Sequence, residues 1–489
     1  MKREAGKTPA TVESGAAPAT VGELSQVFEP LRDQRGKAAW PGYPTREPVY
    51  RPATYWHGLR RAASVRSIVH RAPVSTPLSF PFPPLIWSMH GGCRRIYDGC
   101  FSAFTPNWFR ASHASRREVD DMTQTANTAL GDAGSAPRVG SALADFAVIP
   151  PVDEFMRASA NQRLDTLTKP QGSLGRLEPL VAQICAIQRS LRPVITRPVA
   201  IVFAADHGVA DRGVSAYPRA VTEQMVKNFL AGGAAISVLA RLQGLELWIV
   251  DAGVDGNCGD HPRLINAKIR RGTHDFVERA AMSPNECRDA LRLGHESLDR
   301  AAVAESNTVV FGEMGIGNTA ASALLMHGLT KRALVDCVGR GTGLDDRGLE
   351  HKRIALKAAI ARRAPPDDPL ELLIEFGGFE IAMLTGAIRA AAARRMLVLI
   401  DGFTVTVAAA LAARIDPSVL NYCVFGHCSA EHAHRALLAD LNVQPLLDVD
   451  MRLGEATGAV IALSIVRAAL ALFTDMATFE SAGVSGKDS

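Results

Sequence analysis

The sequence predicts an α/β fold built on a doubly wound parallel sheet of the Rossmann-like class. From about residue 148 onward, short apolar runs rich in β-branched residues alternate with alanine-rich segments of helical period. Each apolar run ends in a cluster of glycine and polar residues, and ligands of open α/β sheets bind at those strand ends. A chain of 489 residues that is 47% hydrophobic has ample material for such a core.

Five near-continuous apolar runs are predicted strands, because strands buried on both faces lack polar alternation. They are residues 199–203, 245–250, 308–311, 396–400 and 422–425. Helices are predicted between and after them, among them residues 220–240, 318–329, 380–394 and 459–473. This alternation favours parallel pairing through right-handed crossovers.

Residues 1–121 differ from the rest of the chain. They are rich in Pro and Arg and show no sustained period of 3.6 or 2, which indicates a disordered or non-native N-terminal extension. Residues 122–147 are then a flexible leader and residues 148–485 the folded domain. A transit peptide is a weaker alternative because acidic residues such as Glu4 and Glu13 are present. A start of translation at Met122 is another.

Charge and cysteine usage exclude several classes of protein. The net charge of +4 provides no field strong enough to hold nucleic acid or an anionic membrane. The eight cysteines lack C-x-x-C spacing, which excludes a zinc finger and favours reduced thiols in a cytoplasmic protein. Ser464 and Arg467 interrupt a long apolar stretch, residues 456–473, and no membrane span is predicted.

A glycine-rich segment, GEMGIGNT at residues 312–319, follows a predicted strand and leads into a helix. Such a segment favours phosphate binding at the helix N-terminus, and the alternative is a tight turn capped by Asn318 or Thr319. A second glycine cluster at residues 339–343 precedes Lys352, which could supply a positive charge to a phosphate or lie in solvent.

Two further clusters suggest chemistry. His427, Glu431 and His434 have helical spacing for metal ligands, although a polar turn at a strand end explains them better. Glu455 precedes an apolar helix and is either a dipole-matched cap or, in a dry crevice, a general base. Asp206 and His207 are adjacent, so their side chains should point apart rather than form a catalytic pair.

Several long motifs together resemble one enzyme family, the nicotinate-nucleotide–dimethylbenzimidazole phosphoribosyltransferases. The motifs occupy residues 169–178, 203–209, 213–218, 312–319, 375–380, 401–403 and 452–455. The resemblance covers about residues 150–485 and implies transfer of the 5-phosphoribosyl group from nicotinate mononucleotide to 5,6-dimethylbenzimidazole. The products are α-ribazole 5′-phosphate, used for the cobalamin lower ligand, and nicotinate. The resemblance implies no cofactor and no metal, because the departing nicotinate is a cationic leaving group.

The resemblance also implies residue roles. Glu455 matches the catalytic base, and Glu313 looks like a second carboxylate near the ribose. The phosphate site corresponds to Gly315, Ile316, Gly317, Asn318 and Lys352, and the acceptor-base pocket to Ser215, Gln224 and Leu453. The family commonly has Gly-Glu-Gly where this chain has Gly454-Glu455-Ala456, a change that is costly if the backbone there has positive φ.

The family is homodimeric, with a smaller helical domain formed from both ends of the catalytic region, so residues 153–189 should pack with the C-terminal helices. Two other functions remain open. One is a non-catalytic protein that binds the nucleotide and the base. The other is a transferase with a different acceptor base, which would differ around Ser215, Gln224 and Leu453.

Overall fold

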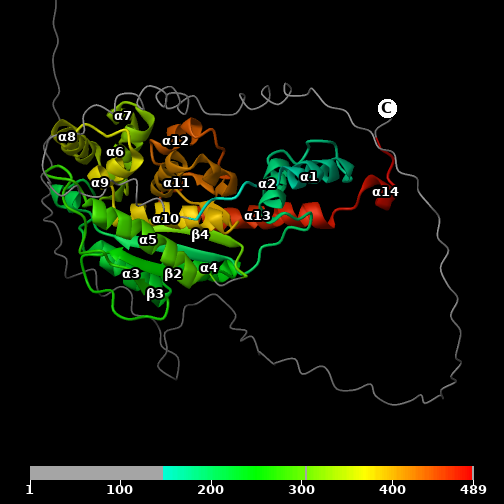
Figure 1. Cartoon of the computed structure of the whole chain (residues 1–489), viewed down its shortest axis with the longest axis horizontal. Coiled ribbons are helices and arrows are strands. Elements are labelled where there is room, and N and C mark those ends of the chain that lie inside the picture. Colours follow the sequence, from blue (N-terminus) through cyan, green and yellow to red (C-terminus); the bar gives the residue numbers. More distant parts are fainter. Residues whose placement is uncertain (1–146, 303–304, 487–489) are drawn as a thin grey trace, which may run out of the picture. The chain divides into compact units, whose positions relative to one another are not determined.

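The computed structural model describes residues 147–302 and 305–486 (Figure 1). The extension predicted for residues 1–121 lies outside these described residues, and so does the leader up to residue 146.

A six-stranded sheet of parallel strands lies at the centre, in the order β3-β2-β1-β4-β5-β6. The strands are β1 (Val199–Ala205), β2 (Glu246–Gly253), β3 (Leu264–Asn266), β4 (Thr308–Met314), β5 (Leu397–Ile400) and β6 (Cys423–Phe425). The predicted α/β fold with a parallel sheet is confirmed, and all five predicted strands are present. The three-residue strand β3 was not predicted, because so short a run carries no recognisable period.

The two central strands, β1 and β4, bring their carboxyl ends together. Phe203 of β1 is in register with Glu313 of β4, so the residues that follow both strands emerge at the same edge. The chain passes from β1 outward to β2 and β3 and then returns across β1 to β4. Such a reversal of strand order opens the crevice in which open α/β sheets bind ligands.

Helices cover the sheet in two groups. α10 (Phe379–Ala393) contacts β1, β2, β4 and β5 and packs closely on α5 (Pro284–Ala301). α13 (Thr457–Asp475) contacts β4 and β5, and α4 (Ala235–Gln243) packs on α13 and β2. The burial of β5 along its whole length follows from its contacts with α10 and α13.

The remaining elements connect these layers. The helices are α1 (Glu154–Thr166), α2 (Leu177–Gln188), α3 (Val221–Ala231), α6 (Asn318–Thr330), α7 (Leu334–Cys337), α8 (Asp346–Arg362), α9 (Pro369–Phe376), α11 (Phe403–Ile415), α12 (His434–Asp440) and α14 (Phe479–Ala482). The 3-10 helices are η4 (Gly208–Arg212) and η5 (Pro417–Tyr422). A second, two-stranded parallel sheet pairs β7 (His427–Cys428) with β8 (Leu447–Asp448).

The helix predicted over residues 220–240 is wrong as a single element. It divides into α3 and α4, because Gly232 ends α3 with φ of 82° and its N–H group reaches back to the Asn228 and Phe229 carbonyls. A glycine in the left-handed conformation is a common helix terminator.

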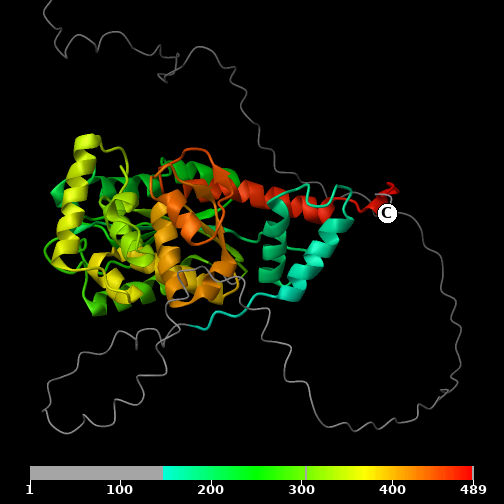
Figure 2. The same cartoon turned by 90° about the horizontal axis from the view of Figure 1, so that it is seen from above.

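The two ends of the described chain pack together. Both views show α1 and α2 beside α13 (Figures 1 and 2). The Arg163 guanidinium on α1 donates to the Phe473 carbonyl at 3.2 Å, and the Thr168 N–H group donates to the Ala477 carbonyl at 3.0 Å. The predicted contact of residues 153–189 with the C-terminal helices is therefore present.

Two segments are long and apolar enough, by length and composition only, to cross a membrane: Val221–Gln243 and Thr457–Asp475. The first contains the break between α3 and α4. The second is α13, which packs on the sheet as the core helices of globular proteins do.

Candidate active site

A cavity opens at the carboxyl ends of the central strands. Five of the predicted site residues line it: Glu313, Gly315, Ile316, Asn318 and Leu453. The rest of the lining comes from segments that are distant in sequence. These are Met314 and Thr319 around the first glycine cluster, Gly341 and Thr342 of the second, Gly402 to Thr404 at the start of α11, Ser429 and Glu431 after β7, and Arg452 and Gly454 beside Leu453.

The first glycine cluster rests on His207, the second residue after β1. A β-carbon built on Gly317 would lie 3.1 Å from His207 Cβ, and Gly317 has φ of 101°, so both space and conformation require glycine. Two of the N–H groups predicted for phosphate binding have partners within the protein. The Ile316 N–H group donates to Thr222 Oγ1 at 3.1 Å, and the Asn318 N–H group donates to the Gly315 carbonyl at 3.1 Å.

Lys352 lies behind the cavity wall and joins the two glycine clusters. Its ammonium donates to Thr319 Oγ1 at 2.9 Å and to the Gly339 carbonyl at 3.2 Å. The side chain is completely buried, and burial lowers the pKa of Lys352 to about 8. A buried ammonium beside Thr319, which lines the cavity, is a ready partner for an anion.

Glu455 and Glu313 are two carboxyl groups whose pKa values are raised well above that of an ordinary glutamate. Glu455 is buried and its Oε2 atom has no hydrogen-bond partner. Burial, and then the negative charge of Asp401, raises the pKa of Glu455 to about 7. Burial, followed by the charges of Glu380, Asp401 and Glu455, raises the pKa of Glu313 to about 8. Neutral pH therefore lies within the titration range of both groups.

The backbone of the 454–456 turn is left-handed throughout. Gly454, Glu455 and Ala456 have φ of 80°, 62° and 67°. Ala456 thus occupies the conformation in which a side chain is costly, roughly 1–2 kcal/mol for each residue. The Glu455 N–H group donates to the Glu313 carbonyl at 3.3 Å, which attaches this turn to the end of β4.

Two buried pairs at the same strand ends were not assigned roles from the sequence. His207 Nε2 lies 2.6 Å from Glu380 Oε1, and both side chains are fully buried. Asp401 Oδ1 accepts the Ala459 N–H group at 2.9 Å and lies 3.5 Å from His427 Nε2. The strand-end positions of His207, Asp401 and His427 were the available signal, but the partners of these residues come from other elements.

The adjacent residues Asp206 and His207 do point apart. Asp206 Oδ1 accepts the Thr222 hydroxyl at 2.7 Å, whereas His207 faces Glu380.

The three residues with metal-ligand spacing, His427, Glu431 and His434, each contact a different partner. His434 Nδ1 accepts the Ser429 N–H group at 2.8 Å, and burial lowers the pKa of His434 to about 3. Glu431 accepts the Gly341 N–H group at 3.0 Å, and His427 faces Asp401. Across residues 147–302 and 305–486, no group of three or more His, Cys, Asp or Glu side chains is arranged to hold a metal ion.

The three residues predicted for the acceptor base are not all at the cavity. Leu453 lines it and is 49% exposed. Ser215, in the loop after η4, is half-buried and Gln224 on α3 is exposed; neither belongs to the cavity lining. The loop that carries Ser215 is nevertheless tied to its surroundings.

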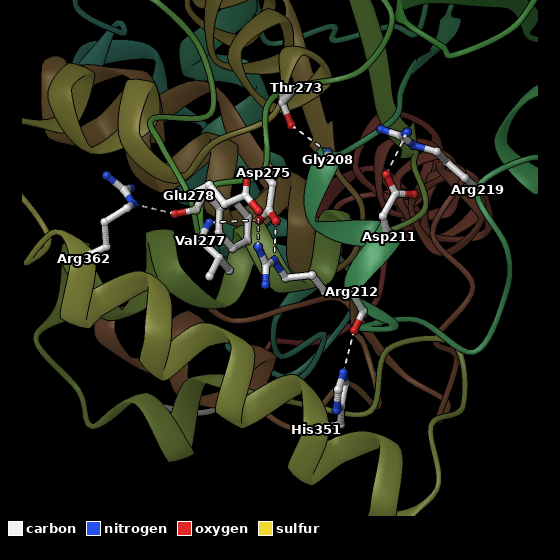
Figure 3. A network of polar contacts seen from close by, with 11 residues as sticks. Gly208, Asp211, Arg212, Arg219, Thr273, Asp275, Val277, Glu278, His351 and Arg362 are labelled. Carbon is white, nitrogen blue, oxygen red and sulfur yellow. Dashed lines mark hydrogen bonds and ion pairs between the residues drawn. The ribbon is translucent and has the colours of Figure 1, made fainter.

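Figure 3 shows how this loop is held. Arg212 forms ion pairs with Asp275 and with Glu278, the latter at 2.7 Å, while its carbonyl lies 2.6 Å from His351 Nε2 (Figure 3). His351 directly precedes Lys352 on α8. The η4 loop is therefore fixed to the helix that carries the buried lysine.

Comparison with known proteins matches this architecture. Residues 149–484 match a family model described as phosphoribosyltransferase. The nicotinate-nucleotide–dimethylbenzimidazole phosphoribosyltransferase of Cupriavidus taiwanensis is 53% identical over 340 residues, which are 70% of this chain and 98% of the relative. The protein of the same name from Roseiflexus sp. is 48% identical over 343 residues, 70% of this chain and 97% of that one. A crystal structure of the enzyme of this name from Thermus thermophilus superposes with a TM-score of 0.65 at 41% identity, covering 68% of this chain and 99% of that chain.

Proposed function

This chain belongs to the nicotinate-nucleotide–dimethylbenzimidazole phosphoribosyltransferase family, and we propose that it transfers the 5-phosphoribosyl group of nicotinate mononucleotide to 5,6-dimethylbenzimidazole. The products are α-ribazole 5′-phosphate and nicotinate, and the reaction belongs to assembly of the cobalamin lower ligand.

The observation that carries the proposal is the buried, unpartnered carboxyl of Glu455, the residue that directly follows Gly454 of the cavity lining. As one benzimidazole nitrogen attacks the anomeric carbon with its lone pair, the other must lose its N–H proton. Glu455 accepts that proton, while the bond from the anomeric carbon to the pyridinium nitrogen breaks and its electron pair leaves with nicotinate. A base with a pKa of about 7 is matched to this task at neutral pH. Attack opposite the leaving group inverts the anomeric centre and accounts for an α product.

On the donor side, the charge of Lys352 and the positive end of the α6 dipole favour the 5′-phosphate. Gly315 to Asn318 form the surface against which the phosphate lies. Lys352 attracts the phosphate from behind Thr319, a residue of the cavity lining whose hydroxyl accepts a hydrogen bond from the Lys352 ammonium. Glu313 holds a proton at pH 7 and therefore presents a neutral carboxyl to the ribose, which avoids repulsion of the anionic nucleotide.

On the acceptor side, Leu453 contacts the face of the benzimidazole, and Ser215 and Gln224 orient its nitrogens. Ser215 lies in the loop after η4, and Gln224 lies on α3 two residues after Thr222, which accepts the N–H group of the cavity-lining Ile316. We also propose a doubly wound sheet, because right-handed crossovers toward β2 and toward β4 lie on opposite faces. α1 and α2 with the end of α13 form the smaller helical domain.

We propose that the enzyme is a cytoplasmic homodimer. Support for the compartment is that the six cysteines among the described residues are free and buried, as reduced thiols of a cytoplasmic protein are. The homodimer rests on membership of the family.

A chromatographic assay of the purified protein with nicotinate mononucleotide and 5,6-dimethylbenzimidazole tests the function. We expect wild type to release nicotinate and form α-ribazole 5′-phosphate in equal amounts, and Glu455→Gln to lose at least about 100-fold in kcat. Glu480→Gln, at an exposed glutamate of α14, is the matched control and should retain wild-type activity.

Two outcomes would change the assignment. Nucleotide binding without nicotinate release from wild type would indicate a non-catalytic binding protein. Faster turnover with another base than with dimethylbenzimidazole would indicate a transferase with a different acceptor.

A further inference from the structure

The helix that follows the catalytic turn lacks a cap of its own. α13 begins after Ala456, whose side chain has no oxygen to accept an N–H group of the first turn. The missing acceptor comes from another element. Asp401, the first residue after β5, accepts the Ala459 N–H group through Oδ1 at 2.9 Å.

This contact fixes the turn that carries Glu455. Ala459 is the third residue of α13, and Glu455 lies one residue before the helix cap, so a shift of the helix start displaces the base. His427 reinforces the position, because its Cδ2 atom would lie only 2.1 Å from a β-carbon on Gly458. The carboxyl ends of β5 and β6 thus hold the first turn of α13 from two sides.

Asp401 also acts on Glu455 by its charge. Its side chain is completely buried, and its Oδ2 atom has no hydrogen-bond partner. The other titratable groups that face this pair are Glu313 at the end of β4, His427 after β6 and, across Glu313, Glu380 at the start of α10. Glu380 is itself paired with His207. Of these carboxyl groups, Asp401 is the one that both accepts an N–H group of α13 and raises the pKa of Glu455 by its charge.

Resting on the transferase function proposed above, we propose that Asp401 is a positioning residue for Glu455. Its carboxylate anchors the base-bearing turn to the strand ends, and its negative charge keeps Glu455 basic enough to take the benzimidazole proton. The proton ends on Glu455 Oε2, which has no other hydrogen-bond partner.

Asp401→Asn separates the two effects, because asparagine keeps an oxygen for the Ala459 N–H group and removes the charge. We expect the acid limb of the kcat/KM profile to move to lower pH by about one unit, since loss of the neighbouring charge makes Glu455 more acidic. The weaker base should lower the plateau by about tenfold. KM for nicotinate mononucleotide should change less than about twofold, because the nucleotide meets other residues. Asp475→Asn, at the exposed far end of α13, should leave the profile unchanged.

The outcomes are distinguishable from failure of the proposed function. If wild type releases no nicotinate, the transferase proposal fails before Asp401 is tested. If wild type is active and Asp401→Asn has the wild-type acid limb and plateau, the positioning role is overturned. A fall in activity without any shift of the acid limb also overturns it, because that result describes a purely structural residue.

A second measurement does not depend on turnover. Infrared difference spectra against the matching Glu455→Gln protein, recorded from about pH 4 to 9, follow the carboxyl band of Glu455 in wild type and in Asp401→Asn, or in Asp401→Ser if the asparagine variant does not fold. A midpoint that is lower in the variant than in wild type supports the role of Asp401, because burial of Glu455 is common to both proteins. Equal midpoints overturn it.

Discussion

Gly312 in β4 packs closely against Ala456 at the start of α13. A β-carbon built on Gly312 would approach the Ala456 backbone nitrogen to 2.2 Å and its Cβ to 2.7 Å. Ala456 is completely buried and has φ of 67°. The absence of a side chain at Gly312 is thus what admits a methyl group at Ala456.

Substitution of Gly312 by alanine should therefore disrupt the site. We expect Gly312→Ala to lower the free energy of unfolding by roughly 1–3 kcal/mol and to reduce kcat strongly, because the displaced residue adjoins Glu455. Ala456→Gly should not rescue it, since the closest atom is the backbone nitrogen. Urea unfolding midpoints and the nicotinate-release assay measure both effects. Gly486→Ala, where no atom lies within 4 Å of the added carbon, is the control.

Ala456→Gly alone should be nearly neutral. It relieves a left-handed alanine, worth roughly 1–2 kcal/mol, and removes a buried methyl group, worth about 0.8 kcal/mol. We expect a change in unfolding free energy within about 1 kcal/mol and retained activity. A loss of several kcal/mol in urea unfolding would show that the methyl group stabilises the turn.

Glu455 should make the protein less stable at alkaline pH. Its pKa is about 7 in the folded protein against an ordinary value of 4.5, so its contribution to stability is complete below about pH 4.5 and is lost as the pH rises through 7. The total loss is about 3 kcal/mol. Glu455→Gln should therefore be more stable than wild type at pH 8 and gain much less at pH 4.5. Urea midpoints of the two proteins at both pH values measure this, and an equal difference at both would contradict it.

Lys352 should govern nucleotide affinity. Lys352→Met removes the buried charge but retains most of the length of the side chain, and we expect KM for nicotinate mononucleotide to rise by about 10- to 100-fold. Stability should not fall, because methionine has no charge to desolvate. Lys357→Met, at an exposed lysine of the same helix, should leave KM unchanged. Steady-state kinetics decide the matter, and an unchanged KM for Lys352→Met would remove Lys352 from the phosphate site.

The ion pairs of Arg212 should affect the acceptor rather than the donor. Arg212→Ala releases the η4 loop from Asp275 and Glu278. We expect KM for dimethylbenzimidazole to rise by only about two- to fivefold, because partly exposed ion pairs contribute little free energy. KM for the nucleotide should be unchanged. Arg279→Ala, a nearby exposed arginine that contacts His274 instead, is the control. A rise in both KM values would show a general loosening of the fold.

Much of the fold followed from local pattern. The runs at residues 199–203 and 308–311 predicted β1 and β4 because strands buried on both faces must be continuously apolar. Gly232 was the local reason that one predicted helix became two, and its role as a terminator depends on a positive φ that composition does not reveal. The short strand β3 gains its stability from pairing with β2 rather than from its own residues.

Only part of the candidate site could be predicted from the sequence. Motif resemblance predicted roles for Glu455 and Lys352, but not the partners that the structure gives them. Asp401 meets Ala459 across 58 positions of sequence, and Lys352 meets Thr319 across 33. Hydrogen bonds between such distant positions leave no periodic trace in the chain.

The sequence by itself determined the alternation of the main strands and helices and the family, because apolar period and long motifs are properties of neighbouring residues. Only the tertiary structure decided how the strand ends converge, which glycine makes room for Ala456, and why Glu455 titrates near neutral pH. Those properties depend on burial and on charges carried by other strands, and they exist only once the parallel sheet has brought its carboxyl ends together.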